Sequence, residues 1–420
     1  MLKLFVLLIS ATLVAAKVYE GFKVFDISVK SQNDLELLRK LHEIEGDARS
    51  LDFLSFHNNL KDTVKLLVSP KEQSFVEDLF AKNKLDFKVA VENVQEKVDE
   101  EMQRQRILEN SKSEVFSFDR YHRLSEIYKH LDDLSKETYS NTQVTVKTVG
   151  KSYEGRDIKT ITISRGDGQS RNSVFLDAGI HAREWIAPAT ALYWINQLVD
   201  PRSNYSKLLD SLDFVIQPVV NPDGYEYTFS IYRLWRKTRT PNGFCRGVDA
   251  NRNYDVYWSK AGSSNKTCSD VYHGPSAFSE KESQTSRDIM QDLKESCKFF
   301  ITLHSYGNYL LFPWGHTTDL PDNWKVVEGV AKAGADAMNK ATGVKYTIGS
   351  ASNALYTVSG SSIDYAFAVA KIPINIVMEL PGGGYLGFDL PASEIEKTVK
   401  ESVIGINAMA EAVAQLYRSN

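Results

Sequence analysis

The chain has 420 residues, of which 42% are hydrophobic and 25% charged, and its formal net charge is -4. A composition this close to the globular average excludes a disordered or fibrous protein, and the length favours two or three domains. The slightly acidic balance argues against a nucleic-acid-binding protein, because such domains are usually strongly basic. The three cysteines form no CxxC pair, so they indicate neither a disulfide-framework miniprotein nor a zinc finger.

Residues 1–16 have the pattern of a secretory signal peptide. Lys3 precedes an apolar run at residues 4–13, and Ala15 and Ala16 stand before a polar lysine. A membrane anchor is the alternative, but the run falls short of the roughly 20 apolar residues that span a bilayer. No later stretch is long enough either. We therefore expect a secreted, extracellular protein that can form disulfides.

Residues 17 to about 94 have the element order β-α-β-β-α-β. Ser31 and Asp34 open the first predicted helix, and a capping box at residues 69–72, with Pro70 at the first helical position, opens the second. This order is typical of a ferredoxin-like α+β domain, a split βαβ sandwich. The pattern predicts strands at residues 23–29, 51–56, 63–68 and 85–91.

A highly charged segment at residues 93–110 follows this small domain and shows no apolar stripe suited to a core. It carries Arg104 and Arg106, and exposed basic residues in a connecting segment are sites where proteolytic cleavage concentrates. We therefore expect cleavage there by a trypsin-like protease, which separates residues 17–106 from residues 107–420. A plain interdomain helix is the alternative, because charge runs usually form solvated faces.

A second, larger unit begins near residue 117. Long helices with a 3.6-residue period are predicted at residues 324–342 and 392–416. Strands alternating with helices indicate an α/β fold, a mixed, mostly parallel twisted sheet covered by helices on both faces. Ligands in such folds bind beyond the carboxyl ends of the strands. The apolar, β-rich runs that fit buried strands are residues 173–180, 214–220, 299–304 and 374–380.

Two H-x-x-E patterns occur, in different contexts. The one at residues 42–45 lies on a charged helix of the small domain and is interpreted as a chance match. His181 and Glu184 instead follow a buried strand directly, and His304 ends another apolar run. Two histidines and a glutamate with an open fourth position are typical of catalytic zinc. From spacing and placement alone, a structural role for His304 stays open.

Six short motifs follow one another along the larger unit. They are HAREW (181–185), NPDGY (221–225), LWRK (234–237), DANRN (249–253), LHSY (303–306) and EL (379–380). In this order they resemble the zinc metallocarboxypeptidases of the pancreatic A/B type. The resemblance covers nearly the whole chain, including the small domain, which is similar to the activation domain of that family. It implies a zymogen of a secreted exopeptidase with one Zn²⁺ per chain.

The resemblance also implies roles for single residues. His181, Glu184 and His304 would hold the zinc. Glu379 would accept a proton from the attacking water, and Arg236 would stabilise the developing oxyanion. The alternatives are a strand-end salt bridge for Glu379 and ordinary surface pairs for the arginines. The residues implied in substrate binding are Arg183, Arg236, Asn251, Arg252, Tyr306, Tyr356 and Ile363.

Selectivity is expected to depend on the segment at residues 355–364. In the family, the residue at the place of Ile363 lies at the base of the specificity pocket, and an aspartate there selects lysine or arginine. Ile363, with Leu355 and Val358 nearby, offers no counter-charge for a basic side chain. Asp364 matches a structural aspartate of the family pattern. The sequence therefore predicts a preference for apolar or aromatic C-terminal residues.

The resemblance further implies a disulfide between Cys245 and Cys268, leaving Cys297 as a buried thiol. Asn204 and Asn265 fit the glycosylation pattern. The glycine-rich stretch at residues 382–384 departs from the family pattern and leaves the shape of that loop open. The expected partners are peptide C termini and an activating trypsin-like protease, with no nucleic acid and no membrane, and the expected state is a monomer. The alternatives are an enzyme for C-terminal lysine or arginine and an inactive binding protein.

Overall fold

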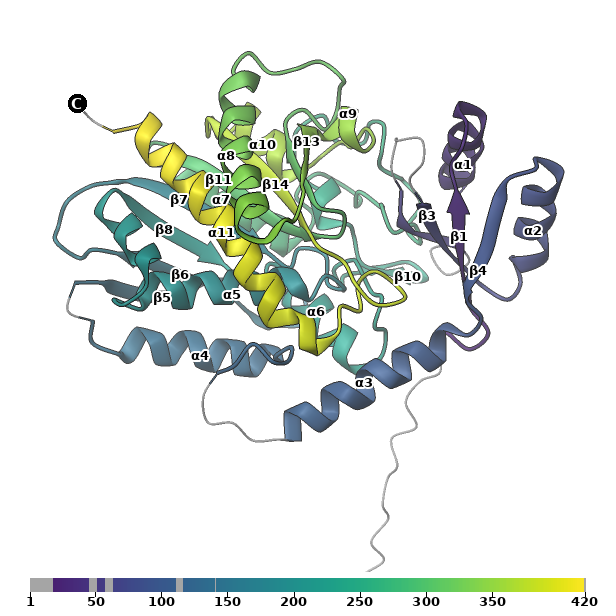
Figure 1. The fold of residues 1–420 in the computed structure, drawn as a ribbon, viewed down its shortest axis with the longest axis horizontal. Helices are drawn as coiled ribbons and strands as arrows, with labels where there is room; N and C mark the ends of the chain where they lie inside the picture. Colours follow the sequence, from purple (N-terminus) through teal and green to yellow (C-terminus); the bar gives the residue numbers. More distant parts are fainter. Residues whose placement is uncertain (1–17, 45–50, 57–62, 111–115, 140, 419–420) are drawn as a thin grey trace, which may run out of the picture.

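The computed structural model contains two bodies joined by one long helix (Figure 1). A small body holds strands β1–β4 with helices α1 and α2, helix α3 connects the two bodies, and a larger body holds the elements from α4 onward. The predicted signal peptide lies outside the described residues. Within the described part of the chain, no helix is both long and apolar enough to cross a bilayer. The structure describes residues 18–44, 51–56, 63–110, 116–139 and 141–418.

The small body has the predicted β-α-β-β-α-β order. Its four strands pair antiparallel in the order β2-β3-β1-β4. Phe25 and Ile27 pack against the two helices on one face of this sheet, whereas Val24 on the other face packs toward Leu234 and Leu386 of the larger body. The elements are β1 (Lys23–Ser28), α1 (Gln32–Ile44), β2 (Leu51–Ser55), β3 (Thr63–Val68), α2 (Gln73–Lys82) and β4 (Asp86–Val91).

The predicted start of the second helix is wrong by a few residues. Helix α2 begins at Gln73, after a turn in which the Glu72 N–H donates to the Ser69 carbonyl at 3.0 Å. The Ser69 hydroxyl is buried and has no hydrogen-bond partner among the described residues, so it does not act as a cap. The proline in this segment therefore belongs to a tight turn ahead of the helix, where its fixed φ is equally suitable.

The charged segment forms helix α3 (Val94–Asn110), so the alternative of an interdomain helix is the structure observed. Arg104 and Arg106 are exposed on it, and α3 runs through the predicted boundary between residues 106 and 107. Glu101 on this helix pairs with Arg233 of the larger body at 2.8 Å. The helix is therefore docked on the larger body rather than solvated on all sides.

The larger body is built on the predicted mixed sheet. Eight strands run in the order β13-β12-β14-β11-β7-β8-β6-β5, and the four central strands β14, β11, β7 and β8 are mutually parallel. These central strands are buried on both faces, which explains their nearly continuous apolar runs. The strands are β5 (Gln143–Lys151), β6 (Asp157–Ser164), β7 (Asn172–Ala178), β8 (Leu212–Gln217), β11 (Cys297–Ser305), β12 (Tyr309–Phe312), β13 (Thr347–Ser350) and β14 (Ile374–Leu380).

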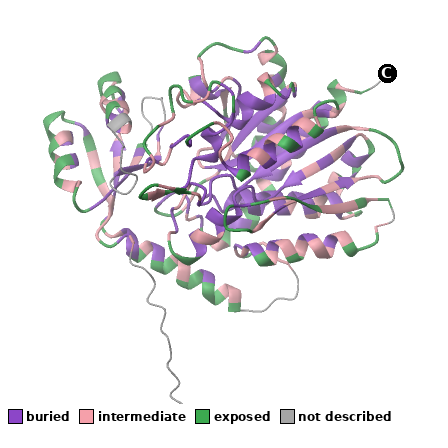
Figure 2. Ribbon diagram, turned by 180° about the vertical axis from the view of Figure 1, so that it is seen from behind, coloured by how far each residue is buried: buried purple, intermediate pink, exposed green. Residues whose placement is uncertain are grey.

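Helices cover both faces of this sheet, as predicted, and Figure 2 shows the buried strands between them. One face packs on α4 (Leu124–Lys136), α5 (Ile186–Val199), α8 (Trp324–Thr342) and α11 (Ala392–Leu416). The opposite face packs on α7 (Lys281–Asp292) and α10 (Ser362–Ala368). Both long helices have the predicted bounds.

The implied disulfide is present between Cys245 and Cys268. It ties a two-stranded ribbon, β9 (Pro241–Asn242) and β10 (Cys245–Arg246), to the loop that follows. Cys297 is fully buried at the start of β11, and burial raises the pKa of its thiol to about 12. That thiol is therefore an inert part of the core.

Candidate metal centre and substrate cleft

Three neighbouring strands of the large sheet end where the predicted site residues stand. His304 and Glu379 are direct register partners on the parallel strands β11 and β14. His181 lies three residues beyond the last residue of β7, the other neighbour of β11. Gly179, the residue that follows β7 on the way to His181, has a φ of +69°, and a Cβ at this position would lie 3.0 Å from Pro188 Cγ. The tight turn at the end of the strand therefore requires glycine. The site therefore lies at the carboxyl edge of the sheet.

His181, Glu184 and His304 converge as a candidate metal centre, with ligand atoms that all lie within 4.8 Å of one another. The Nδ1 atom of His181 is 2.9 Å from Glu184 Oε1, and the Nδ1 atom of His304 is 3.2 Å from Glu184 Oε2. The two Nδ1 atoms are 3.0 Å apart. All three residues are buried. Two imidazole nitrogens and one carboxylate, with room for a fourth ligand, are a donor set that suits zinc.

Asp249 connects this centre to the arginines of the cleft. Its carboxylate lies 3.2 Å from His181 Nε2 and accepts a hydrogen bond from Arg236 Nη2 at 2.8 Å. Burial opposes the charge on Asp249, but Arg236, Arg252 and His181 together hold its pKa well below the usual range. An ionised Asp249 therefore fixes the outer nitrogen of His181, a histidine of the candidate metal centre, as the proton donor.

Arg236 and Glu379 flank the candidate metal centre. Arg236 Nη1 lies 3.8 Å from Glu184 Oε1, so its guanidinium is adjacent to the ligand set. The pKa of Glu379 is raised to about 7, chiefly by burial. The charge of Glu184 also raises this pKa, whereas His304 and Arg236 lower it. A carboxyl group with this property can both accept and release a proton near neutral pH.

Asn251, Arg252 and Tyr356 line the same cavity as the residues of the candidate metal centre, a space of about 140 Å³. Arg252 is anchored by hydrogen bonds from Nε to the Gly262 carbonyl at 2.8 Å and from Nη1 to the Asn251 carbonyl at 3.0 Å. Its Nη2 donates to none of the residues that the structure describes. A fixed guanidinium with a donor left for a ligand is suited to a carboxylate.

The wall of the cavity around Ile363 is apolar. Ile363 is 2% exposed and stands on α10, in the first turn of that helix. Asp364 is engaged elsewhere: its carboxylate accepts hydrogen bonds from the Gly315 N–H at 2.9 Å and the His316 N–H at 3.0 Å. The structural role predicted for Asp364 agrees with this geometry. The aliphatic side chains of the larger body that line the cavity with Ile363 are Leu311, Ala351, Leu355, Val358 and Val377.

The small body covers this cavity. Arg183, implied in substrate binding, makes a buried ion pair with Asp52 of β2 at 2.6 Å, and Asp270 lies 3.9 Å from the same guanidinium. His42, from the pattern interpreted as a chance match, faces Tyr356 with ring centroids 6.2 Å apart. The small body contributes five residues to the lining of the cavity, His42, Phe53, Leu54, Ser55 and Phe56.

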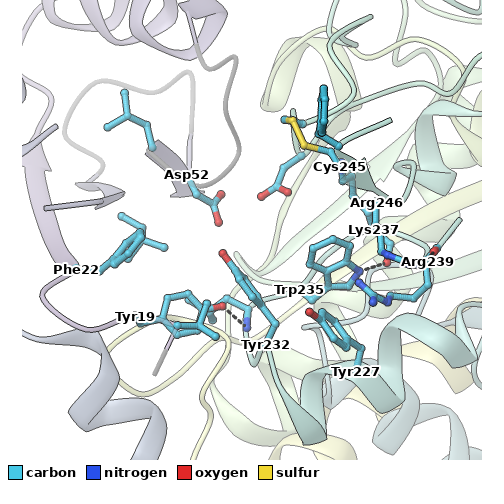
Figure 3. Close-up of a pocket in the computed structure, with 17 residues that line it drawn as sticks. Tyr19, Phe22, Asp52, Tyr227, Tyr232, Trp235, Lys237, Arg239, Cys245 and Arg246 are labelled. Atoms are coloured by element: carbon cyan, nitrogen blue, oxygen red, sulfur yellow. Dashed lines mark hydrogen bonds between the residues drawn. A yellow bond between two sulfur atoms is a disulfide. The ribbon is translucent and has the colours of Figure 1, made fainter. Parts of the chain in front are cut away.

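A second cavity, of about 510 Å³, lies between the two bodies (Figure 3). Asp52 and Phe22 line it from the small body, and Tyr232 and Trp235 line it from the larger one. The Leu234 N–H donates to the hydroxyl of Tyr19 at 3.0 Å across this interface. The two bodies therefore meet through a shared apolar cluster, hydrogen bonds and ion pairs, with this cavity beside them.

Tyr306 lines the same cavity as His304, Arg252 and Glu379. Its hydroxyl is buried and has no hydrogen-bond partner among the described residues, and its ring packs on Phe388 at 5.1 Å. Two residues were missed by the sequence reasoning. Asp249 stands inside the DANRN motif, three residues before Arg252, and that position was a usable signal. Asp52 gave none, because nothing local places a strand residue of the small body against Arg183.

Comparisons with known proteins agree with this geometry. A family model described as zinc carboxypeptidase matches residues 127–405, and one described as carboxypeptidase activation peptide matches residues 25–101. Zinc carboxypeptidase A 1 of Drosophila melanogaster is 35% identical, covering 97% of this chain and 95% of its own length. Carboxypeptidase B of Astacus astacus is 39% identical, covering 71% of this chain and 98% of its own length.

The fold is also similar to solved structures. The crystal structure of the carboxypeptidase A from Helicoverpa armigera superposes with a TM-score of 0.87 at 31% identity, covering 96% of this chain and 99% of that one. A crystal structure of thrombin activatable fibrinolysis inhibitor superposes with a TM-score of 0.81 at 27% identity, covering 94% and 100%. These similarities include the small body as well as the larger one.

Proposed function

Because the chain belongs to the zinc carboxypeptidase family, we propose that it is the precursor of an exopeptidase that removes apolar or aromatic residues from peptide C termini. The observation that carries this selectivity is the apolar wall around Ile363, close to the anchored guanidinium of Arg252. Relatives named carboxypeptidase A and carboxypeptidase B have similar identities, so overall similarity does not decide the substrate. The apolar residues that line the cavity around Ile363 support an apolar or aromatic C-terminal residue.

The chemistry follows from the residues around the centre. His181, Glu184 and His304 would hold the zinc, which would supply Lewis-acid chemistry toward the attacking water and the scissile carbonyl. Glu379 accepts the proton of that water and delivers it to the departing amine. Arg236 donates to the oxygen on which negative charge develops, in a site where such a donor contributes about 3 kcal/mol. The convergence of these groups argues against an inactive binding protein.

Substrate recognition combines a charge clamp with an apolar pocket. Arg252 with Asn251 and Tyr356 would hold the terminal carboxylate, and this restricts the enzyme to the last peptide bond. The terminal side chain would then point toward Ile363. A lysine or arginine would lose its hydration there without gaining an opposite charge, because Asp364 is already held by backbone N–H groups.

Replacing Ile363 by Asp should move the preference toward basic C-terminal residues. The new carboxylate supplies the counter-charge that the pocket lacks, and its burial penalises apolar substrates. We expect kcat/KM for a C-terminal phenylalanine to fall by at least about tenfold and that for arginine to rise. Measuring both substrates on the activated enzyme tests this.

Ile363→Asn is the matched control, since asparagine has the shape of aspartate without its charge. It should lose activity on phenylalanine and gain none on arginine. An unmutated enzyme that already prefers lysine or arginine would overturn the proposed selectivity, and so would an equal gain on arginine in both variants.

We also propose that the protein is exported and that residues 17–106 are an inhibitory propeptide. The signal-like start of the sequence and the Cys245–Cys268 disulfide support export, because such bonds persist in oxidising compartments. The small body supports the inhibitory role by covering the cavity and by pairing Asp52 with Arg183. Detecting the mature protein in the medium of expressing cells, with the leader removed, would test export.

A further inference from the structure

The outer nitrogens of the two zinc-binding histidines have different partners. His181 and His304 both turn Nδ1 toward the candidate metal centre, so both turn Nε2 away from it. The Nε2 atom of His181 meets the carboxylate of Asp249 directly at 3.2 Å. The Nε2 atom of His304 instead meets a neutral hydroxyl, Thr302 Oγ1, also at 3.2 Å. The second histidine therefore lacks the direct carboxylate contact of the first.

A second buried carboxylate lies one strand further on. Asp177 on β7 is the register partner of Thr302 on the parallel strand β11, so the two side chains are neighbours on one face of the sheet. Both residues are 0% exposed. Among the described residues, neither carboxylate oxygen of Asp177 has a hydrogen-bond partner. A fully buried carboxylate in that state requires an explanation, because such a group costs several kcal/mol to bury.

The bound metal determines the direction of the hydrogen bonds. When Nδ1 of His304 is a ligand, its proton resides on Nε2, which must donate to Thr302 Oγ1. The hydroxyl of Thr302 then accepts that bond, and its own hydrogen is left to donate elsewhere. The carboxylate of Asp177, next to it on the neighbouring strand, is the acceptor that the sheet register provides.

We infer that Thr302 and Asp177 are positioning residues for zinc, forming a relay from His304 Nε2–H to the threonine oxygen and from the threonine hydroxyl to the aspartate. Each zinc-binding histidine is then oriented by a carboxylate, His181 directly by Asp249 and His304 through one hydroxyl. Neither residue touches substrate. The relay depends on zinc binding at this centre and is independent of the selectivity proposed above.

Asp177 also has other buried polar neighbours, which define the competing explanation. Gln217 is its register partner on β8, and the amide nitrogen of Gln217 has no hydrogen-bond partner among the described residues. The hydroxyl of Tyr254 is also without a hydrogen-bond partner among the described residues. Burial is the largest cause that raises the pKa of this phenol, and the charge of Asp177 raises it further. If Asp177 served only these groups, its loss would change the stability of the fold and leave zinc affinity unchanged.

The test compares zinc affinities of activated enzyme that has been stripped of metal and checked for folding by circular dichroism. Zinc is titrated against a chromophoric chelator. Thr302→Val keeps the shape of the side chain and removes the hydroxyl, and we expect about 10- to 100-fold weaker zinc binding. Thr302→Ser restores the hydroxyl and should bind zinc like the unmutated enzyme. Asp177→Asn keeps an acceptor but no charge, so its loss should be smaller than that of Thr302→Val but measurable.

Thr190→Val is the matched control. Thr190 is as buried as Thr302, but its hydroxyl donates to the Ile186 carbonyl within α5, away from the metal centre. This variant should lose stability without losing zinc affinity. The inference is overturned if Thr302→Val binds zinc within about threefold of the unmutated enzyme, or if Thr302→Ser fails to restore binding. It is also overturned if Asp177→Asn binds zinc normally, since the relay would then end at the threonine.

Discussion

Replacing Glu379 by Gln is expected to lower kcat of the activated enzyme by about 10²- to 10⁴-fold, while zinc remains bound. Glutamine keeps the shape of the side chain but cannot accept the proton of the attacking water. The raised pKa of Glu379, caused chiefly by burial, indicates a group suited to this exchange near neutral pH. Steady-state kinetics on an apolar C-terminal substrate, with metal analysis of the same sample, provide the measurement.

The matched control is Glu184→Gln, which alters a ligand of the candidate metal centre instead of the base. That variant should lose zinc together with activity, whereas Glu379→Gln should lose activity alone. The role proposed for Glu379 would be wrong if its glutamine variant kept activity within about tenfold, or if it lost the metal.

The full precursor is expected to be nearly inactive and to gain activity by about 100-fold or more when cut near Arg104 or Arg106. If the docked arrangement is more stable than the open one by a free energy of about 2.7 kcal/mol, the cleft is open in only about 1% of the molecules. The Asp52–Arg183 and Glu101–Arg233 pairs both hold it in place. Cleavage separates these carboxylates from the catalytic body and lets them diffuse away.

The experiment follows mass and activity together while the purified precursor is incubated with trypsin. Because both arginines lie on α3, that helix must open before a protease can bind it, so activation should be slower than digestion of an unstructured peptide of the same sequence. A precursor in which both arginines are replaced by glutamine is the control and should stay inactive. Equal specific activity before and after the cut would rule out inhibition, and activation of the control would place the cut elsewhere.

Asp52→Asn tests the docking directly. It leaves the buried guanidinium of Arg183 with the Leu234 carbonyl at 3.4 Å and the more distant carboxylate of Asp270 at 3.9 Å. Breaking a buried pair in this way costs up to about 3–5 kcal/mol. The uncut variant should therefore show at least about tenfold more activity than the uncut precursor, with unchanged activity after cleavage. Equal activity of the two uncut proteins would show that this ion pair does not hold the small body in place.

Local patterns in the sequence were sufficient for most of the fold. The buried strand at residues 374–380 and the two long helices have the predicted bounds, because apolar periodicity and burial reflect the same local requirement. The β-α-β-β-α-β order of the small body was predictable for the same reason. The start of α2 was not, since a capping box and a tight turn use the same residues, and only the packing around Ser69 distinguishes them.

The candidate site divides in a similar way. His181 and Glu184 stand three residues apart after a strand and His304 ends another apolar run, so these three could be identified from local patterns, and the motif resemblance supplied Glu379. Only the tertiary structure determined that Asp249 orients His181 and that Asp52 covers Arg183. It also placed Asp177 beside Thr302 through the register of two strands that are far apart in sequence. Sequence periodicity reports which face of an element is buried, whereas contacts between distant elements depend on how the strands pair and how the two bodies dock.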